Sequence, residues 1–370
     1  MPFNFNVPTT ESDASVTIQS DALRKFLKLA VSVIPNKTSV SVIENIRIVA
    51  DKGKGYLLAT DLSNYVRMDI SAAGTGKIDL IVKCIAVNAL VAKMGNGPIY
   101  IERKGDMLTF KSTGALCFEI PGKAGIDFPI QKSLGKEKYS LSWTPDAVDY
   151  VQANLLPVCT DDPAIPALAG VMVSTDGTDC GFLSTNRHIL VSMGNIYDNR
   201  FTVPAAMFTT LSLAKFMHPI SVSMREFGVS ASCGGITVYS EYIKGSFPET
   251  IEKLIPTEFK YKYRLRVGKL KSHVDKMVEL ATSPKESAVP LAVFFRPDTF
   301  CVDMMNVDCT DADTCGEDMW MRMDARMWQV ALARFNDAVE ITAGFNNNNT
   351  ATTWKDSRAT TLVMPLMPNR

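Results

Sequence analysis

Residues 15–30 read SVTIQSDALRKFLKLA, in which apolar and polar side chains alternate as in a strand until Ser20, where helical spacing begins. The same kind of passage returns as YSLSWTPDAVDYVQANL at 139–155 and as YRLRVGKLKSHVDKMVEL at 263–280. The alternation breaks at three positions spaced 124 residues apart, namely Ser20, Thr144 and Gly268. Since serine and threonine are good N-cap residues, we expect Ser20 and Thr144 to cap helices.

A second passage also occurs three times, as DLIVKCIAVNALVAKM (79–94), RFTVPAAMFTTLSLAKF (200–216) and MWMRMDARMWQVALARF (319–335). Aligning Lys83, Pro204 and Asp324 gives spacings of 121 and 120 residues, and a basic residue recurs near the end of each copy. Each copy reads as a short strand that leads into an amphipathic helix, and alternating strands follow it. Two independent repeats with a similar period predict one structural unit in three copies.

We therefore predict an α+β protein of three repeated domains, each with two helices and about eight strands in antiparallel sheets. The domains are placed at 1–136, 137–257 and 258–370. Three unrelated domains with ordinary helix spacing are the alternative, and the agreement of both spacings disfavours it.

The composition is that of a chain able to bury sizeable cores. Of its 370 residues 46% are hydrophobic and 21% are charged, which excludes wholesale disorder. No apolar run of about 18 residues predicts a membrane span, and the first residues do not resemble a signal peptide, so we expect a cytoplasmic protein. The eight cysteines include no CxxC pair, and Cys309 and Cys315 have no histidine nearby, so we expect neither a metal site nor a disulfide.

The charges are unevenly distributed, although Lys+Arg and Asp+Glu each number 39. The first predicted domain holds 17 basic and 12 acidic residues, the second 7 and 12, and the third 15 and 15. A basic surface must therefore come from a subset of the elements.

No catalytic motif is present in the sequence. The segment Gly74–Lys77 lacks the upstream glycine and the final hydroxyl residue of a P-loop, HExxH and GxSxG are absent, and the three histidines have no ligand spacing. We expect neither an enzyme nor a bound cofactor. A repeat-built protein whose sheets bind other proteins, such as a phage structural component, is one alternative, and an enzyme with a site at a domain seam is a weaker one.

Five segments resemble, in the same order, the bacterial DNA polymerase III β sliding clamp: VSVIPNKTSVSVIENIRIVADKGKGYLLATDLSNYVRMDI (31–70), PALAGVMVS (166–174), STNRHILVS (184–192), SFPETIEKLIP (246–256) and TLVMPLMPNR (361–370). The last segment is similar to the clamp's Met-Pro-Met ending and continues four residues further. The resemblance covers nearly the whole chain at low residue identity, which fits a divergent clamp encoded by a phage.

The resemblance implies a non-catalytic processivity factor. In that fold each domain places two helices on an inner wall with its sheets outside, and two chains join head to tail into a ring around duplex DNA. Such a ring needs only a sequence-independent attraction to phosphates, because its topology holds it on the DNA. The implied partners are double-stranded DNA, a DNA polymerase, a clamp loader, other proteins with clamp-binding motifs and a second copy of the chain, without a membrane.

Basic residues on the predicted inner helices are the expected DNA contacts. In the first helix they lie opposite an apolar face formed by Leu23, Phe26, Leu27 and Val31. The expected DNA-facing residues are Arg24, Lys25, Lys28, Lys37, Lys83, Lys93, Lys215, Lys269, Lys271, Lys276 and Arg326, with Arg334 as a further candidate. A solvated helix face is the alternative for each of them. The middle domain has Ala205 and Ala206 where relatives often carry basic residues, so we expect contacts mainly from the first and third domains.

The resemblance also implies an apolar pocket, between the second and third domains, for short peptides of polymerase, loader and repair proteins. Its implied residues are Leu168, Thr185, His188, Leu190, Pro248, Leu254, Leu362, Met364, Pro365 and Leu366. Leucine, methionine and proline suit an adaptable trough, and Thr185 and His188 can supply hydrogen bonds. The family's Asp-Gly pair and two of its arginines are replaced here, by Asn186-Arg187, Ile189 and Lys253. The preferred peptide can therefore differ from that of a host clamp.

Head-to-tail closure requires the outer edge of the first domain to meet that of the third by edge-strand pairing. The candidate edge is MLTFKSTGALCFEI (107–120), and an acidic stretch at 308–318 is its candidate counterpart. The expected interface residues are Arg103, Lys104, Lys111, Leu116, Ile120, Asp311, Asp313 and Glu317. Ala115 and Cys117 stand where a more basic edge is usual, so we expect a larger share of apolar contact. A solvated acidic loop is the alternative.

Overall fold

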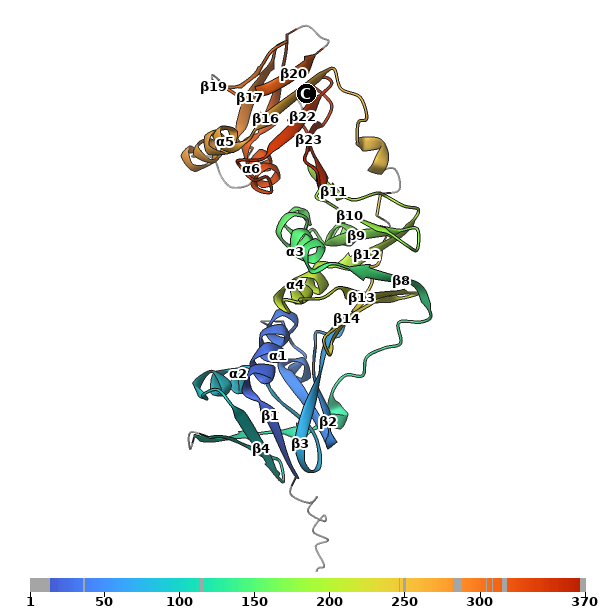
Figure 1. The fold of residues 1–370 in the computed structure, drawn as a ribbon, viewed down its shortest axis with the longest axis vertical. Helices are drawn as coiled ribbons and strands as arrows, with labels where there is room; N and C mark the ends of the chain where they lie inside the picture. Colours follow the sequence, from blue (N-terminus) through green and yellow to red (C-terminus); the bar gives the residue numbers. More distant parts are fainter. Residues whose placement is uncertain are drawn as a thin grey trace, which may run out of the picture. The chain divides into compact units, whose positions relative to one another are not determined.

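The computed structural model describes residues 14–35, 37–113, 116–245, 247–248, 251–281, 288–303, 305–307, 309–314 and 318–366 (Figure 1). The chain separates into two compact units. Unit 1 comprises Met1–Val148 and Ala206–Glu241, and unit 2 comprises Asp149–Ala205 and Tyr242–Arg370. The predicted middle domain contributes residues to both units, and the three domain boundaries stay a prediction.

The α-helices of the described residues are α1 (Ser20–Val33), α2 (Cys84–Lys93), α3 (Pro145–Asn154), α4 (Ala205–Leu213), α5 (Gly268–Leu280) and α6 (Ala325–Ala333). α1, α3 and α5 begin at or directly after the three breaks in the first repeat. α2, α4 and α6 begin directly after the aligned residues Lys83, Pro204 and Asp324. Both repeats are therefore confirmed at the level of the helix starts. None of these helices is both long and apolar enough to cross a membrane.

Of the two expected N-caps, one is correct. The Thr144 hydroxyl oxygen accepts a hydrogen bond from the backbone N–H of Ala147 at 3.1 Å, at the start of α3. The expectation for Ser20 is wrong, because Ser20 is the first residue of α1 itself. Its hydroxyl oxygen accepts instead from the N–H of Gly97 at 3.1 Å, which ties the start of α1 to the segment after α2.

Unit 1 is built on one eleven-stranded sheet. Its strands are β1 (Ala14–Gln19), β2 (Asn45–Thr60), β3 (Asn64–Lys83), β4 (Pro98–Lys104), β5 (Met107–Ser112), β6 (Cys117–Pro121), β7 (Lys123–Ala124), β8 (Glu137–Trp143), β13 (Ile220–Arg225), β14 (Gly228–Cys233) and β15 (Ile236–Glu241). The order is β6-β5-β4-β1-β3-β15-β14-β13-β8, and β2 and β7 also pair with β3. The β3–β15 pairing is antiparallel and joins strands of the first and second predicted domains into one sheet.

The strands of unit 2 form two sheets. They are β9 (Gly170–Thr175), β10 (Cys180–Thr185), β11 (Ile189–Met193), β12 (Asn199–Pro204), β16 (Tyr261–Arg266), β17 (Pro290–Phe295), β18 (Phe300–Val302), β19 (Met305–Asn306), β20 (Cys309–Thr314), β21 (Met319–Asp324), β22 (Glu340–Phe345), β23 (Thr352–Lys355) and β24 (Ala359–Val363). One sheet has the order β12-β9-β10-β11-β24-β23-β22-β16-β20, and the other β19-β18-β17-β21. Aromatic side chains pack the two sheets together, and the ring centres of Phe295 and Phe345 are 4.3 Å apart.

Helix α1 packs against β2 and β3 and lies beside α2 (Figure 1). Its buried face includes Leu23 and Phe26, as expected. Val31 departs from the expectation, because its side chain is 52% exposed. It stands seven residues, or about two turns, after Arg24, so the two share a helix face and line a groove beside α2 together with Lys28.

Candidate functional site

A tight turn between β10 and β11 builds one wall of an apolar pocket in unit 2. The Thr185 hydroxyl donates to the carbonyl of Ile189 at 2.7 Å and accepts from the N–H of Arg187 at 3.1 Å. The Asn186 side-chain oxygen accepts from the N–H groups of His188 at 3.0 Å and Ile189 at 2.8 Å. These side-chain bonds satisfy the backbone where the ladder is interrupted. Since the Thr185 proton is used inside the turn, the hydrogen bond expected from this residue to a partner is not available in this arrangement.

The floor of the pocket belongs to the core of unit 2. Pairing of β11 with β24 places Leu190 opposite Leu362, and the N–H of Met364 donates to the carbonyl of His188 at 2.8 Å. Leu168 and Ile251 are buried in the same hydrophobic cluster. Because these side chains are held by a sheet and a core, the pocket has a preformed base.

The pocket has a volume of about 220 Å³. Its lining residues are Leu168, Thr185, Arg187, His188, Ile189, Leu190, Pro248, Ile251, Leu254, Leu362 and Met364. Eight of the ten residues implied by the resemblance therefore lie together around one cavity. Leu254 and Met364 remain 55% and 40% exposed at its rim, so a ligand could still cover apolar surface there.

Two of the implied residues lie elsewhere, and three lining residues are additional. Pro365 is buried, and the N–H of Leu366 donates to the carbonyl of Arg322 on β21 at 2.8 Å, so neither residue lines the cavity. The additional lining residues are Arg187, Ile189 and Ile251. All three lie in segments that carry the resemblance, two of them at positions where this chain departs from the family.

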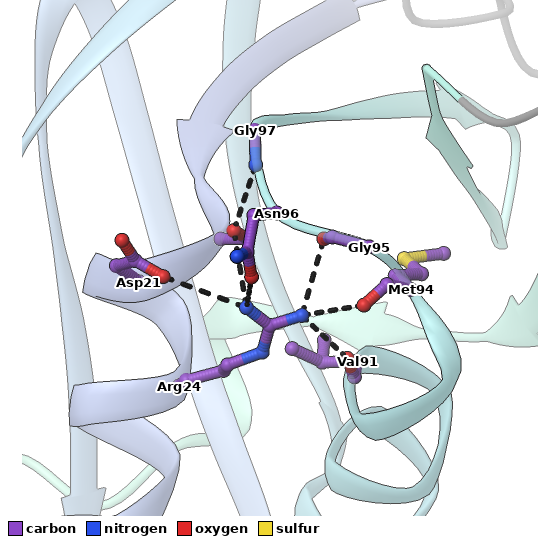
Figure 2. Close-up of polar contacts among 8 residues, drawn as sticks. Asp21, Arg24, Val91, Met94, Gly95, Asn96 and Gly97 are labelled. Atoms are coloured by element: carbon purple, nitrogen blue, oxygen red, sulfur yellow. Dashed lines mark hydrogen bonds and ion pairs between the residues drawn. The ribbon is translucent and has the colours of Figure 1, made fainter.

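Arg24, the first of the expected DNA contacts, is engaged within unit 1 (Figure 2). Its guanidinium donates to the carbonyls of Met94 at 2.5 Å and Gly95 at 3.1 Å, and to the Asn96 side chain at 2.8 Å. These acceptors lie at and just beyond the end of α2, where backbone carbonyls have no partner within the helix. A cation is favourable there because it also opposes the negative end of the helix dipole.

Lys271 on α5 makes the corresponding contact in unit 2. Its ammonium donates to the carbonyl of Phe335 at 3.0 Å and to the Asp337 carboxylate at 2.6 Å, just after α6. Met94 and Phe335 each stand eleven residues after the aligned positions Lys83 and Asp324, so they are equivalent in the repeat. Thus a cation on α1 bonds to the end of α2, and a cation on α5 bonds to the end of α6.

We expect Arg24→Gln and Lys271→Gln to destabilise the protein. Each change removes charge-assisted hydrogen bonds to helix-end groups, which should lower the free energy of unfolding by about 2 kcal/mol. Thermal denaturation should show a decrease of about 4–8 °C for each variant. The exposed Lys28→Gln on α1 is the matched control, with an expected change below about 0.5 kcal/mol. If Arg24→Gln had the same melting temperature as this control, the helix-end contact would not be stabilising.

Most of the other expected DNA contacts are exposed. They are Lys25, Lys28, Lys37, Lys83, Lys93, Lys215, Lys269 and Lys276, while Arg326 is half-buried. Lys83 lies 3.6 Å from the Glu44 carboxylate. These exposed lysines are the residues of the set best able to meet a ligand phosphate, and their contact with DNA stays a prediction.

Arg334 is a correction to the expected set, because its side chain is only 2% exposed. Its guanidinium donates to the Tyr150 hydroxyl at 2.7 Å and to the carbonyl of Ala359 at 3.2 Å, and it lies 3.8 Å from the Asp356 carboxylate. Burial lowers the pKa of this guanidinium, while Tyr150 and Asp356 favour its charged form. Arg334 therefore holds α3, α6 and the β23–β24 turn together inside unit 2.

The expected interface residues are spread over several strands near two sheet ends: Arg103 and Lys104 lie on β4, Lys111 on β5, Leu116 just before β6, Ile120 on β6, and Asp311 and Asp313 on β20. β6 ends the sheet of unit 1, and β20 ends the larger sheet of unit 2. Among these residues Lys104, Leu116, Asp311 and Asp313 are exposed, Arg103 and Lys111 are half-buried, and Ile120 is buried in its own unit. Lys111 pairs with Glu102 at 2.7 Å and Asp311 lies 4.0 Å from Arg264, while Glu317 is outside the described residues.

No metal-binding cluster occurs in the part of the chain that the structure describes. No group of three or more His, Cys, Asp or Glu side chains there could hold a metal ion.

Comparison with known proteins identifies the fold. No family model and no curated protein sequence matches the chain. Solved structures match it closely. The DNA polymerase sliding clamp of Bacillus subtilis matches with a TM-score of 0.85 and 16% identity over 97% of this chain and 100% of that one. The putative DNA polymerase III β subunit of Eubacterium rectale matches at 0.84 and 16% over 95% and 99%. A Pseudomonas aeruginosa sliding clamp bound to griselimycin matches at 0.83 and 16% over 96% and 100%.

These matches show that the chain has the sliding-clamp fold along nearly its whole length. The predicted α+β class, with helices backed by antiparallel sheets in a repeated arrangement, is confirmed. Identity of 16% explains why the resemblance in sequence is limited to short segments.

Proposed function

We propose, from its sliding-clamp fold, that this chain is a DNA sliding clamp, of which two copies encircle duplex DNA and tether a polymerase to it. The observation that carries the proposal is the fold match, which spans 95–97% of this chain and 99–100% of the compared structures. In this proposal the chain binds DNA and other proteins and catalyses no reaction. It would act in the cytoplasm of a bacterium or of a phage-infected cell.

Exposed lysines on α1 and α5 support the contact with DNA. Lys25, Lys28, Lys269 and Lys276 are exposed on these two helices. Weak, screened contacts with phosphates suit a protein that slides, whereas tight contacts with base edges would stop it. These lysines would attract the DNA phosphates, and the closed ring would keep the protein on the DNA.

The sheet ends support ring closure. In the described residues, β6 and β20 each pair with a neighbour on one side, and their other edges offer unpaired backbone groups. We infer that β6 of one chain meets β20 of the other, twice, in a head-to-tail dimer. Apolar contact from Leu116 and attraction between basic and acidic side chains would add to the strand pairing.

The pocket supports the docking of partner proteins. Its apolar base and exposed rim suit short peptides carried by a polymerase, a clamp loader and other replication proteins. Griselimycin, which is bound to the similar clamp of Pseudomonas aeruginosa, is proposed as a ligand of this pocket.

The oligomeric state tests the proposed function. Sedimentation equilibrium at micromolar concentration should give twice the chain mass of 40.6 kDa, and images of single particles should show a closed outline with a central hole. Phe118→Arg on β6, which pairs opposite Phe110, should shift the equilibrium toward the monomer. A strictly monomeric wild-type protein without ring-shaped particles would rule out the dimeric clamp. The alternative of a phage structural protein is not favoured by the fold match.

A further inference from the structure

Arg187 gives the pocket a positive charge. It is the only Lys, Arg, Asp or Glu among the described residues that line the cavity, and the other lining residues are mostly apolar. No Asp or Glu occurs among the described residues that line the cavity. A ligand that fills the cavity with an apolar group would therefore meet one positive charge.

The guanidinium of Arg187 is available to such a ligand. The side chain is exposed, and no acceptor for its guanidinium occurs among the residues that the structure describes. The backbone N–H of Arg187, in contrast, is fixed by the Thr185 hydroxyl, and the N–H groups of the next two residues are fixed by Asn186. The turn therefore holds the base of the side chain while leaving its charged end unpaired.

The backbone at Arg187 is in an unfavourable conformation for an arginine. Its φ is +77°, in the left-handed region that glycine adopts without a penalty and that a residue with a Cβ rarely adopts. The position thus retains a side chain at some cost to the fold. Such a cost is expected where the side chain has a use outside folding.

We infer that Arg187 selects peptides that place a carboxylate beside the apolar group occupying the pocket. A guanidinium binds a carboxylate through two parallel hydrogen bonds, and the apolar walls reduce the screening of that pair by water. The carboxylate can be an Asp or Glu side chain or the C-terminus of the peptide. This inference rests on the proposed function and specifies the partner chemistry of the same pocket.

A phage-displayed library of random heptapeptides provides the first test. The dimeric full-length protein is the target, and peptides that still bind Leu254→Gln/Met364→Gln are discarded as binding outside the pocket. We expect Asp or Glu to be enriched beside apolar residues in peptides selected on the wild type, and not in those selected on Arg187→Gly. Equal acid content in the two selections would overturn the inference.

Synthetic versions of one selected peptide then locate the carboxylate. The acidic residue is changed to its amide, and the C-terminus is made as the acid or the amide, in all four combinations. Loss of the relevant carboxylate should weaken binding to the wild type by about 3- to 10-fold, and by less at higher salt. The same loss should change binding to Arg187→Gly or Arg187→Gln by less than about 2-fold, while Arg187→Lys keeps part of the preference. A preference that persists in Arg187→Gly would contradict the inference.

Thermal denaturation separates recognition from a structural role. Arg187→Gly relieves the left-handed strain, so its melting temperature should be unchanged or higher by up to about 4 °C. A decrease of similar size would mean that the arginine serves the fold, and would count against the inference. If no selected peptide depended on Leu254 and Met364, the proposed docking function would fail as well. Pocket-dependent peptides without acid preference would remove only the role of Arg187.

Discussion

Leu254→Gln/Met364→Gln is expected to weaken griselimycin binding by about 10- to 100-fold. Both side chains are apolar lining residues at the rim of the pocket, and a bound ligand would bury them. Full burial of such a side chain is worth about 1.5–3 kcal/mol and about half of each is still exposed, so loss of both contacts corresponds to about one to two orders of magnitude in affinity. Titration calorimetry with the wild type and the variant measures the difference directly.

The same substitutions should leave the fold almost unchanged. Leu254 and Met364 are 55% and 40% exposed, so polar replacements remove little core packing. Leu280→Gln and Met217→Gln are matched controls, since these residues are 77% and 87% exposed and do not line the pocket. Equal griselimycin affinity in the pocket variant and the controls would exclude this cavity as the binding site.

Replacement of four exposed helix lysines should markedly reduce the salt dependence of DNA binding. The variant is Lys25→Gln, Lys28→Gln, Lys269→Gln and Lys276→Gln. Each lost phosphate contact lowers the slope of log affinity against log salt by about 0.9, so complete loss would lower it by about 3–4 per chain. Affinity for a short linear duplex, measured by fluorescence anisotropy between about 50 and 200 mM salt, gives the slope.

A control with the same net charge distinguishes local contact from overall electrostatics. Lys54, Lys77, Lys138 and Lys262 are exposed lysines on strands, and their replacement by glutamine removes the same four charges. This control should keep most of the slope. A slope that fell equally in both quadruple variants would mean that the lysines of α1 and α5 have no special contact with DNA.

The repeat predicted the helix starts correctly because it records local patterns. An alternating strand followed by Gly268, or by Thr144 and Pro145, limits where a helix can begin, whatever lies around it. The expectation for Ser20 failed because its hydrogen-bond partner, Gly97, lies 77 residues away. The expectation that Val31 is buried was wrong for a related reason. Helical spacing shows which side of α1 is apolar, but not how much of that side the neighbouring elements bury.

At the pocket, too, the sequence predicted some features and missed others. The resemblance named eight lining residues, because each lies in a segment that carries family features. It did not foresee that the Thr185 proton is used within its own turn, or that Leu366 bonds to Arg322 on β21. The Leu366 contact depends on which strands meet, and no spacing in the sequence records it.

The amino-acid sequence alone determines the period of the repeat and the strand and helix segments. It also determines which residue types are available for DNA and peptide binding. The folded chain assigns those residues their environments. Arg24 and Lys271 hold helix ends, Arg334 is buried, and Arg187 keeps an exposed guanidinium without an acceptor among the described residues. The physical reason is that a cation's hydration and hydrogen-bond partners come from groups distant in the chain, so an identical side chain can stabilise the fold at one position and serve recognition at another.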